Sequence, residues 1–238
     1  MNEQDAALQE AKISGFTQAM QAEWGDYYIL LNQLSSDYQL AACLRLLDAA
    51  DGLLNREVSV NDSSVQERFM LAGIEDKKVS LDNTLLGEMS GFASFKKVVK
   101  NDPAGLAKLM KVIPSTGPID GWHFSQFIDT YQMWFADNGF KQTQLFPATR
   151  LLSMKRPDQF VALSDSTAEI IYQALEIKPL KKQDFQRYWD DIILPIQKTK
   201  WFNAYQPMDA AELPFFRVRV ALLERLAATA SEVTLAAE

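Results

Sequence analysis

The stretch Gln144-Leu-Phe-Pro-Ala-Thr-Arg-Leu-Leu-Ser-Met-Lys-Arg-Pro-Asp-Gln-Phe-Val-Ala-Leu-Ser-Asp-Ser-Thr167 determines the expected fold. Pro147 suits the first turn of a helix, and Pro157 must end that helix because the residue before a proline is pushed out of the α region. Phe160-Val-Ala-Leu163 is short and apolar enough to be a buried extended segment. The side chains from Ser164 to Thr167 are candidate N-caps for a following helix. The stretch therefore predicts a helix, a tight corner and a second helix.

Three cations of this stretch, Arg150, Lys155 and Arg156, are not explained by its prolines, caps and apolar run. In a structural interpretation they are solvated or paired with the abundant acids of the chain. In a functional interpretation they present phosphate-binding charges beside a helix N-terminus. Both interpretations stay open from the sequence.

The composition extends the helical expectation to the whole chain. With 238 residues and 47% hydrophobic content, the chain can bury a sizeable core. Ten Gly and nine Pro are too few for a turn-dense β-sandwich. We therefore expect a mainly α, multi-helix globular bundle with a helix-corner-helix element near residues 147–176 and little or no β structure.

Apolar spacing before this element predicts further helices. Residues 3–54 read as two helices in an antiparallel hairpin, with a break at Ser35-Ser36-Asp37 and an end at Asp51-Gly52. In the polar segment that follows, Val58 and Val60 alternate with polar neighbours, as in a short exposed strand or loop. This segment is the expected domain boundary.

The region from Leu85 onward reads as the main helical domain. A helix from Leu85 is expected to stop at Asn101-Asp102-Pro103, where an aspartate cap and a proline start the next helix. An amphipathic helix follows over Trp122–Phe135, and a final helix spans Phe215–Ala228. The expected division is an N-terminal helical hairpin, an irregular linker or small hairpin, a main domain and a flexible tail, over residues 1–54, 55–84, 85–228 and 229–238.

The charge is uneven along the chain, although the total is −7. Residues 1–140 hold 11 Lys and Arg against 19 Asp and Glu, whereas residues 141–225 hold 13 against 10. A locally basic C-terminal region is therefore expected on an acidic protein. Lys198-Thr-Lys-Trp-Phe202 also interleaves cations with aromatics, a pattern of nucleic-acid binders. The candidate nucleic-acid or partner contacts are Arg150, Lys155, Arg156, Lys200, Trp201, Arg217 and Arg219.

Several chemistries lack their motifs. The chain has no phosphate-binding glycine loop and no dinucleotide-binding Gly-x-Gly-x-x-Gly. His123 is the only histidine and is expected at a helix start or in packing, and Cys43 is the only cysteine. No catalytic residue, metal ligand or cofactor is assigned, although Asp158, Asp165 and Lys155 could approximate a metal nuclease around the corner.

The N-terminus has no basic or apolar signal region, and no apolar run is long enough to span a bilayer. A cytoplasmic protein without a membrane partner is expected. The oligomeric state cannot be read from the sequence.

Parts of the chain resemble an uncharacterised family of helical bacterial proteins. The resemblance rests on Leu85–Phe95 with Asn101–Pro103, on Ala148–Val161, and on three short later motifs, Tyr188–Ile193, Trp201–Asn203 and Arg217–Leu223. Such regions are associated with ATPases and GTPases of modification-dependent restriction and other phage-defence systems. The family has the pattern Asp-Ser-x-Asn-Arg after the apolar run. This chain has Asp165-Ser-Thr-Ala-Glu169 there, so the asparagine and the arginine of the pattern are missing. The resemblance implies a link to DNA or to an antiviral defence complex.

Three functions follow as expectations. The first is a non-enzymatic interaction protein of a bacterial defence or mobile-element system, which contacts DNA or a partner ATPase through a basic C-terminal face. The second is a small metal-dependent hydrolase acting on nucleic acid. The third is an acidic inhibitor of a defence enzyme, in which the N-terminal half mimics nucleic acid.

Overall fold

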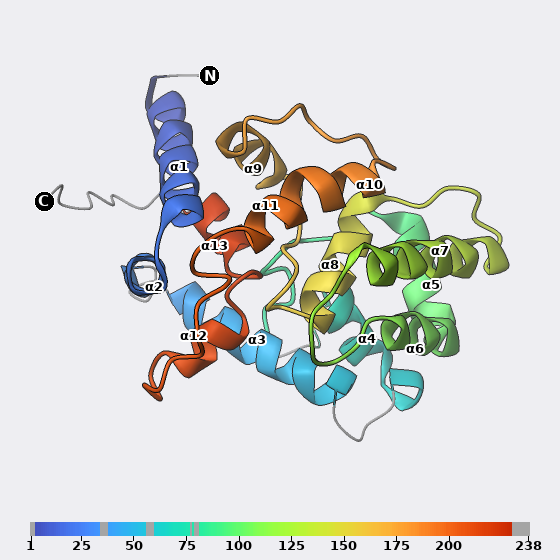
Figure 1. Ribbon diagram of the computed structural model, residues 1–238. Coiled ribbons are helices and arrows are strands. Elements are labelled where there is room, and N and C mark those ends of the chain that lie inside the picture. Colours follow the sequence, from blue (N-terminus) through green and yellow to red (C-terminus); the bar gives the residue numbers. More distant parts are fainter. Residues whose placement is uncertain (1–2, 34–37, 56–59, 77, 79–80, 230–238) are drawn as a thin grey trace, which may run out of the picture.

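The computed structural model describes residues 3–33, 38–55, 60–76, 78 and 81–229. Its regular elements within these ranges are all helices, which are arranged as one multi-helix bundle (Figure 1). The predicted all-α fold class is confirmed. No helix among the described residues is long and apolar enough to cross a lipid bilayer.

Residues 3–55 form three helices where the spacing predicts two. They are α1 (Glu3–Gln21), α2 (Trp24–Gln33) and α3 (Tyr38–Asn55). The chain turns before Trp24 because the aromatic face of α2 packs on the C-terminal region, with the Trp24 and Phe216 ring centroids 5.0 Å apart. The predicted helix end at Asp51-Gly52 is wrong, since α3 continues to Asn55. The predicted break at residues 35–37 lies outside the described residues.

The polar segment after α3 contains helical turns. A 3₁₀ turn, η2 (Val60–Asp62), precedes α4 (Val65–Ala72). The Ser64 side chain accepts from the Glu67 N–H, and the Glu67 carboxylate accepts from the Ser64 N–H, which is a capping box. Val60 is buried and helical, so the prediction that it is exposed is wrong, and Val58 lies outside the described residues.

Residues 85–92 do not form the predicted helix, because Leu86 and Gly87 have positive φ angles of 61° and 104°. The loop instead lies against the end of α4, where the Met89 N–H donates to the Gly73 carbonyl at 2.7 Å. A Cβ on Gly73 would lie 2.4 Å from the Gly87 oxygen, so this approach requires glycine. The helix begins only at Ala93.

Three helices follow: α5 (Ala93–Asn101), α6 (Pro103–Val112) and α7 (Gly121–Asp137). Asp102 caps α6 with Pro103 in the first turn, as predicted, and its carboxylate accepts from the Gly105 N–H at 2.8 Å. The apolar side of the predicted amphipathic helix is buried in α7. In Figure 1, α5, α6 and α7 lie together on the side of the molecule away from α1.

The corner that follows is built as the sequence predicts. Helix α8 (Leu145–Lys155) ends before Pro157, and Phe160–Leu163 is fully buried. The Thr149 hydroxyl accepts from the Leu163 N–H at 2.9 Å, which holds the buried segment against α8. The next helix is α9 (Ala168–Ala174), but its N-cap residue, Thr167, makes no side-chain capping bond.

The C-terminal region is divided into short helices. They are α10 (Phe185–Tyr188), the π-helical turn η3 (Trp189–Ile193), α11 (Leu194–Gln197), α12 (Leu213–Arg217) and α13 (Leu223–Ala228). The predicted single helix over Phe215–Ala228 is therefore wrong. Its chain turns inward because the N–H groups of Val220 and Ala221 donate to the Pro157 carbonyl, at 3.1 and 2.8 Å.

The buried side chains form one continuous cluster from Phe16 to Ala227. Helix α1 packs on α9 and α13, α3 and α4 pack on α8, and α6 packs on α7. The N-terminal helices thus cover elements from the other end of the chain. The division into separate domains stays a prediction.

Candidate functional site

Arg150 is fully buried in the centre of the molecule. Its guanidinium donates to the carbonyls of Leu71 at 3.1 Å and Met70 at 3.0 Å, and also to those of Leu85 and Asn83. Burial lowers the pKa of Arg150 to about 10, and the charge of Glu224 opposes this shift. Arg150 therefore ties α8 to the end of α4 and to the loop at residues 83–85.

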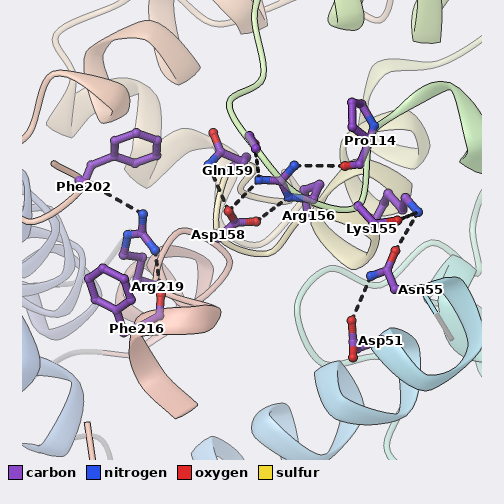
Figure 2. Close-up of polar contacts among 12 residues, drawn as sticks. Asp51, Asn55, Pro114, Lys155, Arg156, Asp158, Gln159, Phe202, Phe216 and Arg219 are labelled. Atoms are coloured by element: carbon purple, nitrogen blue, oxygen red, sulfur yellow. Dashed lines mark hydrogen bonds and ion pairs between the residues drawn. The ribbon is translucent and has the colours of Figure 1, made fainter. Parts of the chain in front are cut away.

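Lys155, at the end of α8, is also buried. Its ammonium donates to the Asn55 side-chain oxygen at 2.6 Å, the Ser115 hydroxyl at 2.9 Å and the Leu54 carbonyl at 3.3 Å. Burial and the neighbouring Arg156 charge lower the pKa of Lys155. The side chain joins the end of α3 to the loop between α6 and α7 (Figure 2).

Arg156 is buried beside Lys155 and forms the centre of the corner. Its guanidinium bonds to both carboxylate oxygens of Asp158 at 2.8 Å, and to the carbonyls of Pro114 and Gly117 at 2.9 and 2.8 Å (Figure 2). Burial alone would raise the pKa of Asp158, but the Arg156 bonds outweigh burial and lower it. All the guanidinium nitrogens of Arg156 are thus used inside the fold.

Arg219 holds the chain near α12. It donates to the Phe216 carbonyl at 2.8 Å and to the Phe202 carbonyl at 3.2 Å. Its guanidinium lies 4.2 Å from the Phe216 ring centroid and 5.1 Å from that of Phe202 (Figure 2). Arg219 therefore clamps both ends of the loop between these two residues.

Trp201 is fully buried and is a core anchor in this structure. Its indole N–H donates to the Ala19 carbonyl at 2.8 Å, and its ring stacks on Tyr27 with centroids 4.3 Å apart. Lys200 is exposed and pairs with Glu23 at 2.5 Å. Arg217 is exposed on α12.

The seven predicted contact residues therefore do not form one exposed basic face. Five of them are at least nine-tenths buried: Arg150, Lys155, Arg156, Trp201 and Arg219. Their polar groups are largely bonded within the protein, where buried charges need such partners. In this structure the predicted basic C-terminal face becomes a set of internal braces, with only Lys200 and Arg217 at the surface.

Exposed cations gather instead on α5 and α6. Residues 93–112 carry five lysines, all exposed, and one acid. We define the α5–α6 lysine face as Lys96, Lys97, Lys100, Lys108 and Lys111. The lysines lie opposite the buried side chains of each helix, such as Phe95 and Val98 on α5 and Leu106 and Leu109 on α6.

The one acid of this segment, Asp102, is held by internal hydrogen bonds. Its carboxylate accepts from Gly105 N–H at 2.8 Å, and from the Trp134 indole and the Asn138 amide, each at 3.0 Å. Burial alone would raise the pKa of Asp102, but these bonds lower it. The carboxylate is occupied in joining α6 to α7 and forms none of these bonds with a lysine.

A comparison of the total charge of residues 1–140 with that of residues 141–225 does not reveal the α5–α6 lysine face. Residues 1–140 are acidic overall, although their segment 93–112 has a formal charge of +4. A window of about two short helices, combined with apolar periodicity, would have found it. Conversely, the excess of cations in residues 141–225 includes residues that brace the core.

The hydrolase alternative requires acidic side chains that converge on a metal ion. Among the described residues, no group of three or more His, Cys, Asp or Glu side chains could hold a metal ion. Asp158 is bonded to Arg156 and Gln159, and Asp165 is exposed. His123 lies at the start of α7, where it forms a reciprocal cap with Asp120.

Comparisons with protein-family models, curated proteins and solved structures gave no match to this chain.

Proposed function

We propose that this chain is a non-enzymatic interaction protein that binds an anionic partner through the α5–α6 lysine face. The observation that carries this proposal is the set of five exposed lysines on two consecutive helices. The one acid between them is engaged by α7 and by its own helix. A locally cationic surface on an acidic protein attracts anions to one place and not to the surface as a whole.

The proposed class of function is the one predicted from the sequence, but the binding surface is the α5–α6 lysine face and not a C-terminal face. The side chains predicted for the contact are mostly internal, whereas the five lysines of α5 and α6 are exposed. Among them, the Lys96 ammonium lies 5.6 Å from the centroid of the Phe69 ring. Residues 93–103 also lie within the region that resembles helical proteins of restriction and phage-defence systems. A bacterial defence or mobile-element setting is the context that this resemblance supports.

Heparin-affinity chromatography tests the proposal. We expect the wild-type protein to be retained despite its net charge of −7. Charge reversal at Lys97, Lys100 and Lys108 is expected to abolish retention. The matched control reverses Lys178, Lys181 and Lys182, three exposed lysines on the loop before α10, with the same change in net charge. Retention that is lost equally in both variants, or absent in the wild type, would contradict the proposal.

Binding to a protein partner is a second candidate function, and the observation that favours it is an exposed loop far from α5 and α6 in the sequence. Tyr205 and Met208 are 98% and 102% exposed in the loop before α12. The loop ends are held by Arg219, by two bonds from the Asn203 amide, and by the 2.5 Å bond from the Trp24 indole to Glu212. Tyr and Met are enriched at protein interfaces, and a loop whose ends are already held loses less freedom on binding than a loop with free ends.

Pull-down from the native host with nuclease treatment tests this second candidate. We expect proteins that remain after nuclease digestion to be lost when Tyr205→Ser and Met208→Ser are combined. The control is Leu8→Ser with Met133→Ser, which replaces two other exposed apolar side chains on α1 and α7. Retention of the same proteins by the Tyr205 and Met208 variant would reject the loop as a docking site.

A further inference from the structure

We infer that the partner of the α5–α6 lysine face is duplex DNA, held by its sugar-phosphate backbone without reading of the base sequence. This inference rests on the proposed function, because it names the anion that the same lysines bind. Its starting point is the juxtaposition of two lysine-bearing helices at one edge of the molecule (Figure 1).

The spacing of the lysines suits a row of phosphates. Lys96 and Lys100 are four residues apart, and Lys97 and Lys100 are three apart, so they are neighbours on the surface of α5. Lys108 and Lys111 repeat the three-residue step on α6. Side chains at these steps have Cβ atoms about 5–6 Å apart. A duplex carries about one charge per 3.4 Å along each strand, so flexible lysine stems can reach successive phosphates.

Some exposed acids lie on elements that pack against α6, namely Asp62 on η2 and Asp129 and Asp137 on α7. At physiological ionic strength the Debye length is about 8 Å, so charges on the far side of the molecule are largely screened from a bound strand. The segment itself has five lysines and only Asp102 as an acid. That carboxylate is turned toward Gly105, Trp134 and Asn138 by its hydrogen bonds.

The chemistry of the face favours phosphate contact over base reading. Its cations are all lysines, which act as mobile point charges and lack the planar fork with which arginine recognises guanine. Lysine contacts to phosphate position a protein on DNA and carry no sequence information. The face therefore predicts similar affinity for unrelated duplexes.

Two other macromolecules fit the face less well. Single-strand binders stack bases on exposed aromatic rings, but Phe95 is buried, and no large apolar side chain is exposed on α5 or α6. Protein interfaces are enriched in aromatic residues, Met and Arg and depleted in Lys. A lysine face without exposed apolar anchors matches a phosphate backbone better than an acidic protein surface.

Fluorescence anisotropy with a labelled duplex of mixed sequence tests the inference. We expect binding with a slope of log affinity against log salt near −4, since each neutralised phosphate contributes about −0.9 for duplex DNA. Reversal of the α5 pair, Lys97→Glu with Lys100→Glu, and of the α6 pair, Lys108→Glu with Lys111→Glu, is expected to weaken binding at least tenfold each. Each pair is also expected to lower the slope by about 2.

Three further measurements complete the test. Lys178→Glu with Lys182→Glu has the same change in charge and is expected to bind as the wild type. A second duplex of unrelated sequence is expected to bind within about twofold, because backbone contacts do not distinguish sequences. Urea unfolding of every variant shows whether a loss of binding reflects a loss of folding.

The outcomes separate this inference from the proposed function. Heparin retention that depends on the α5–α6 lysines, without binding to duplex DNA, would overturn the inference and leave the proposed function standing. Tighter binding to single-stranded DNA, or equal competition by polyglutamate, would overturn it in favour of a base-stacking or acidic-protein partner. Loss of heparin retention by the control loop alone would overturn both.

Discussion

Helix α5 carries three lysines, and helix α8 with the residue that follows it carries three Lys or Arg residues, but the structure uses the two sets in opposite ways. On α8 and just after it, Arg150, Lys155 and Arg156 are buried and bonded to carbonyls, amides and a carboxylate. On α5, Lys96, Lys97 and Lys100 are exposed to solvent. The positively charged side chains therefore stabilise the interior of the fold at α8, whereas those of α5 lie on the protein surface.

The difference follows from what surrounds each helix. Helix α5 has one apolar stripe, formed by Phe95, Val98 and Val99, and its three lysines lie at exposed positions away from this stripe. Helix α8 is buried on all sides, with α3 and α4 packed against it, so even Arg150 points into the protein. A cation on a helix with an exposed side is available to partners, whereas one on a central helix must find its bonds inside.

The largest effect is expected for Arg150→Met, which tests the brace directly. The substitution leaves up to four buried carbonyls without their donor. We expect a loss of about 3–5 kcal/mol in the free energy of unfolding, as when one partner of a buried charged contact is removed. Urea unfolding measures this free energy. The control is Lys108→Met, which replaces an exposed cation of α6. Equal losses in the two variants would end the contrast between buried and exposed cations.

A smaller loss is expected for Asp158→Asn, and it depends on pH. Because the folded pKa of Asp158 is lowered, the stability from its ionised form is present above the unfolded-state pKa and is lost as pH falls through the folded pKa. At pH 7 we expect the variant to lose about 1.5–3 kcal/mol, the range for a hydrogen bond to a charged group.

Urea midpoints of both proteins at pH 7 and at about pH 3 check this sign, because the unfolded-state pKa of Asp is about 3.9. The difference between wild type and variant is expected to shrink at the lower pH. A difference that stays constant would show that the Asp158 charge does not stabilise the corner.

Lys97→Gln with Lys100→Gln is expected to leave the urea midpoint nearly unchanged, because both side chains are exposed. The same variant is expected to elute from heparin at lower salt than the wild type. This outcome would place the two lysines in binding and not in folding. A large fall in the urea midpoint would instead make α5 a structural counterpart of α8.

The smallest effect is expected for Lys200→Ala. Its ion pair with Glu23 joins two side chains that are 67% and 63% exposed, and such pairs contribute little to stability. Neither the urea midpoint nor heparin retention is expected to change measurably. A clear loss of heparin retention would return Lys200 to the candidate binding residues.

The rules for prolines and helix caps, which depend on a few neighbouring residues, correctly predicted the elements that no distant contact disturbs. Pro147 lies in the first turn of α8, and α8 ends before Pro157. Asp102 caps α6, and Pro103 is its first residue. Predictions failed where distant contacts intervened. The helix expected from Leu85 gave way to a loop that meets Gly73, and the helix expected from Phe215 was broken by bonds to the Pro157 carbonyl. Neither partner can be read from its local sequence.

The candidate site shows the same division. The lysines of α5 and α6 are recoverable from apolar periodicity and a short charge window, because each helix has one apolar stripe and its lysines lie away from that stripe. The burial of Arg219 depends on two rings, Phe202 and Phe216, that a long loop separates in the chain. Counting charges over long segments cannot distinguish these cases.

The sequence by itself determined the helical class, the corner after α8 and the placement of lysines opposite an apolar stripe on α5 and α6. These features depend on backbone restriction by proline, on capping and on helical periodicity, which act over a few residues. Only the tertiary structure decided that Arg150, Lys155 and Arg156 are internal. Their partners, such as the Leu71 carbonyl, Asn55 and the Pro114 carbonyl, come from distant segments that meet only when the core forms.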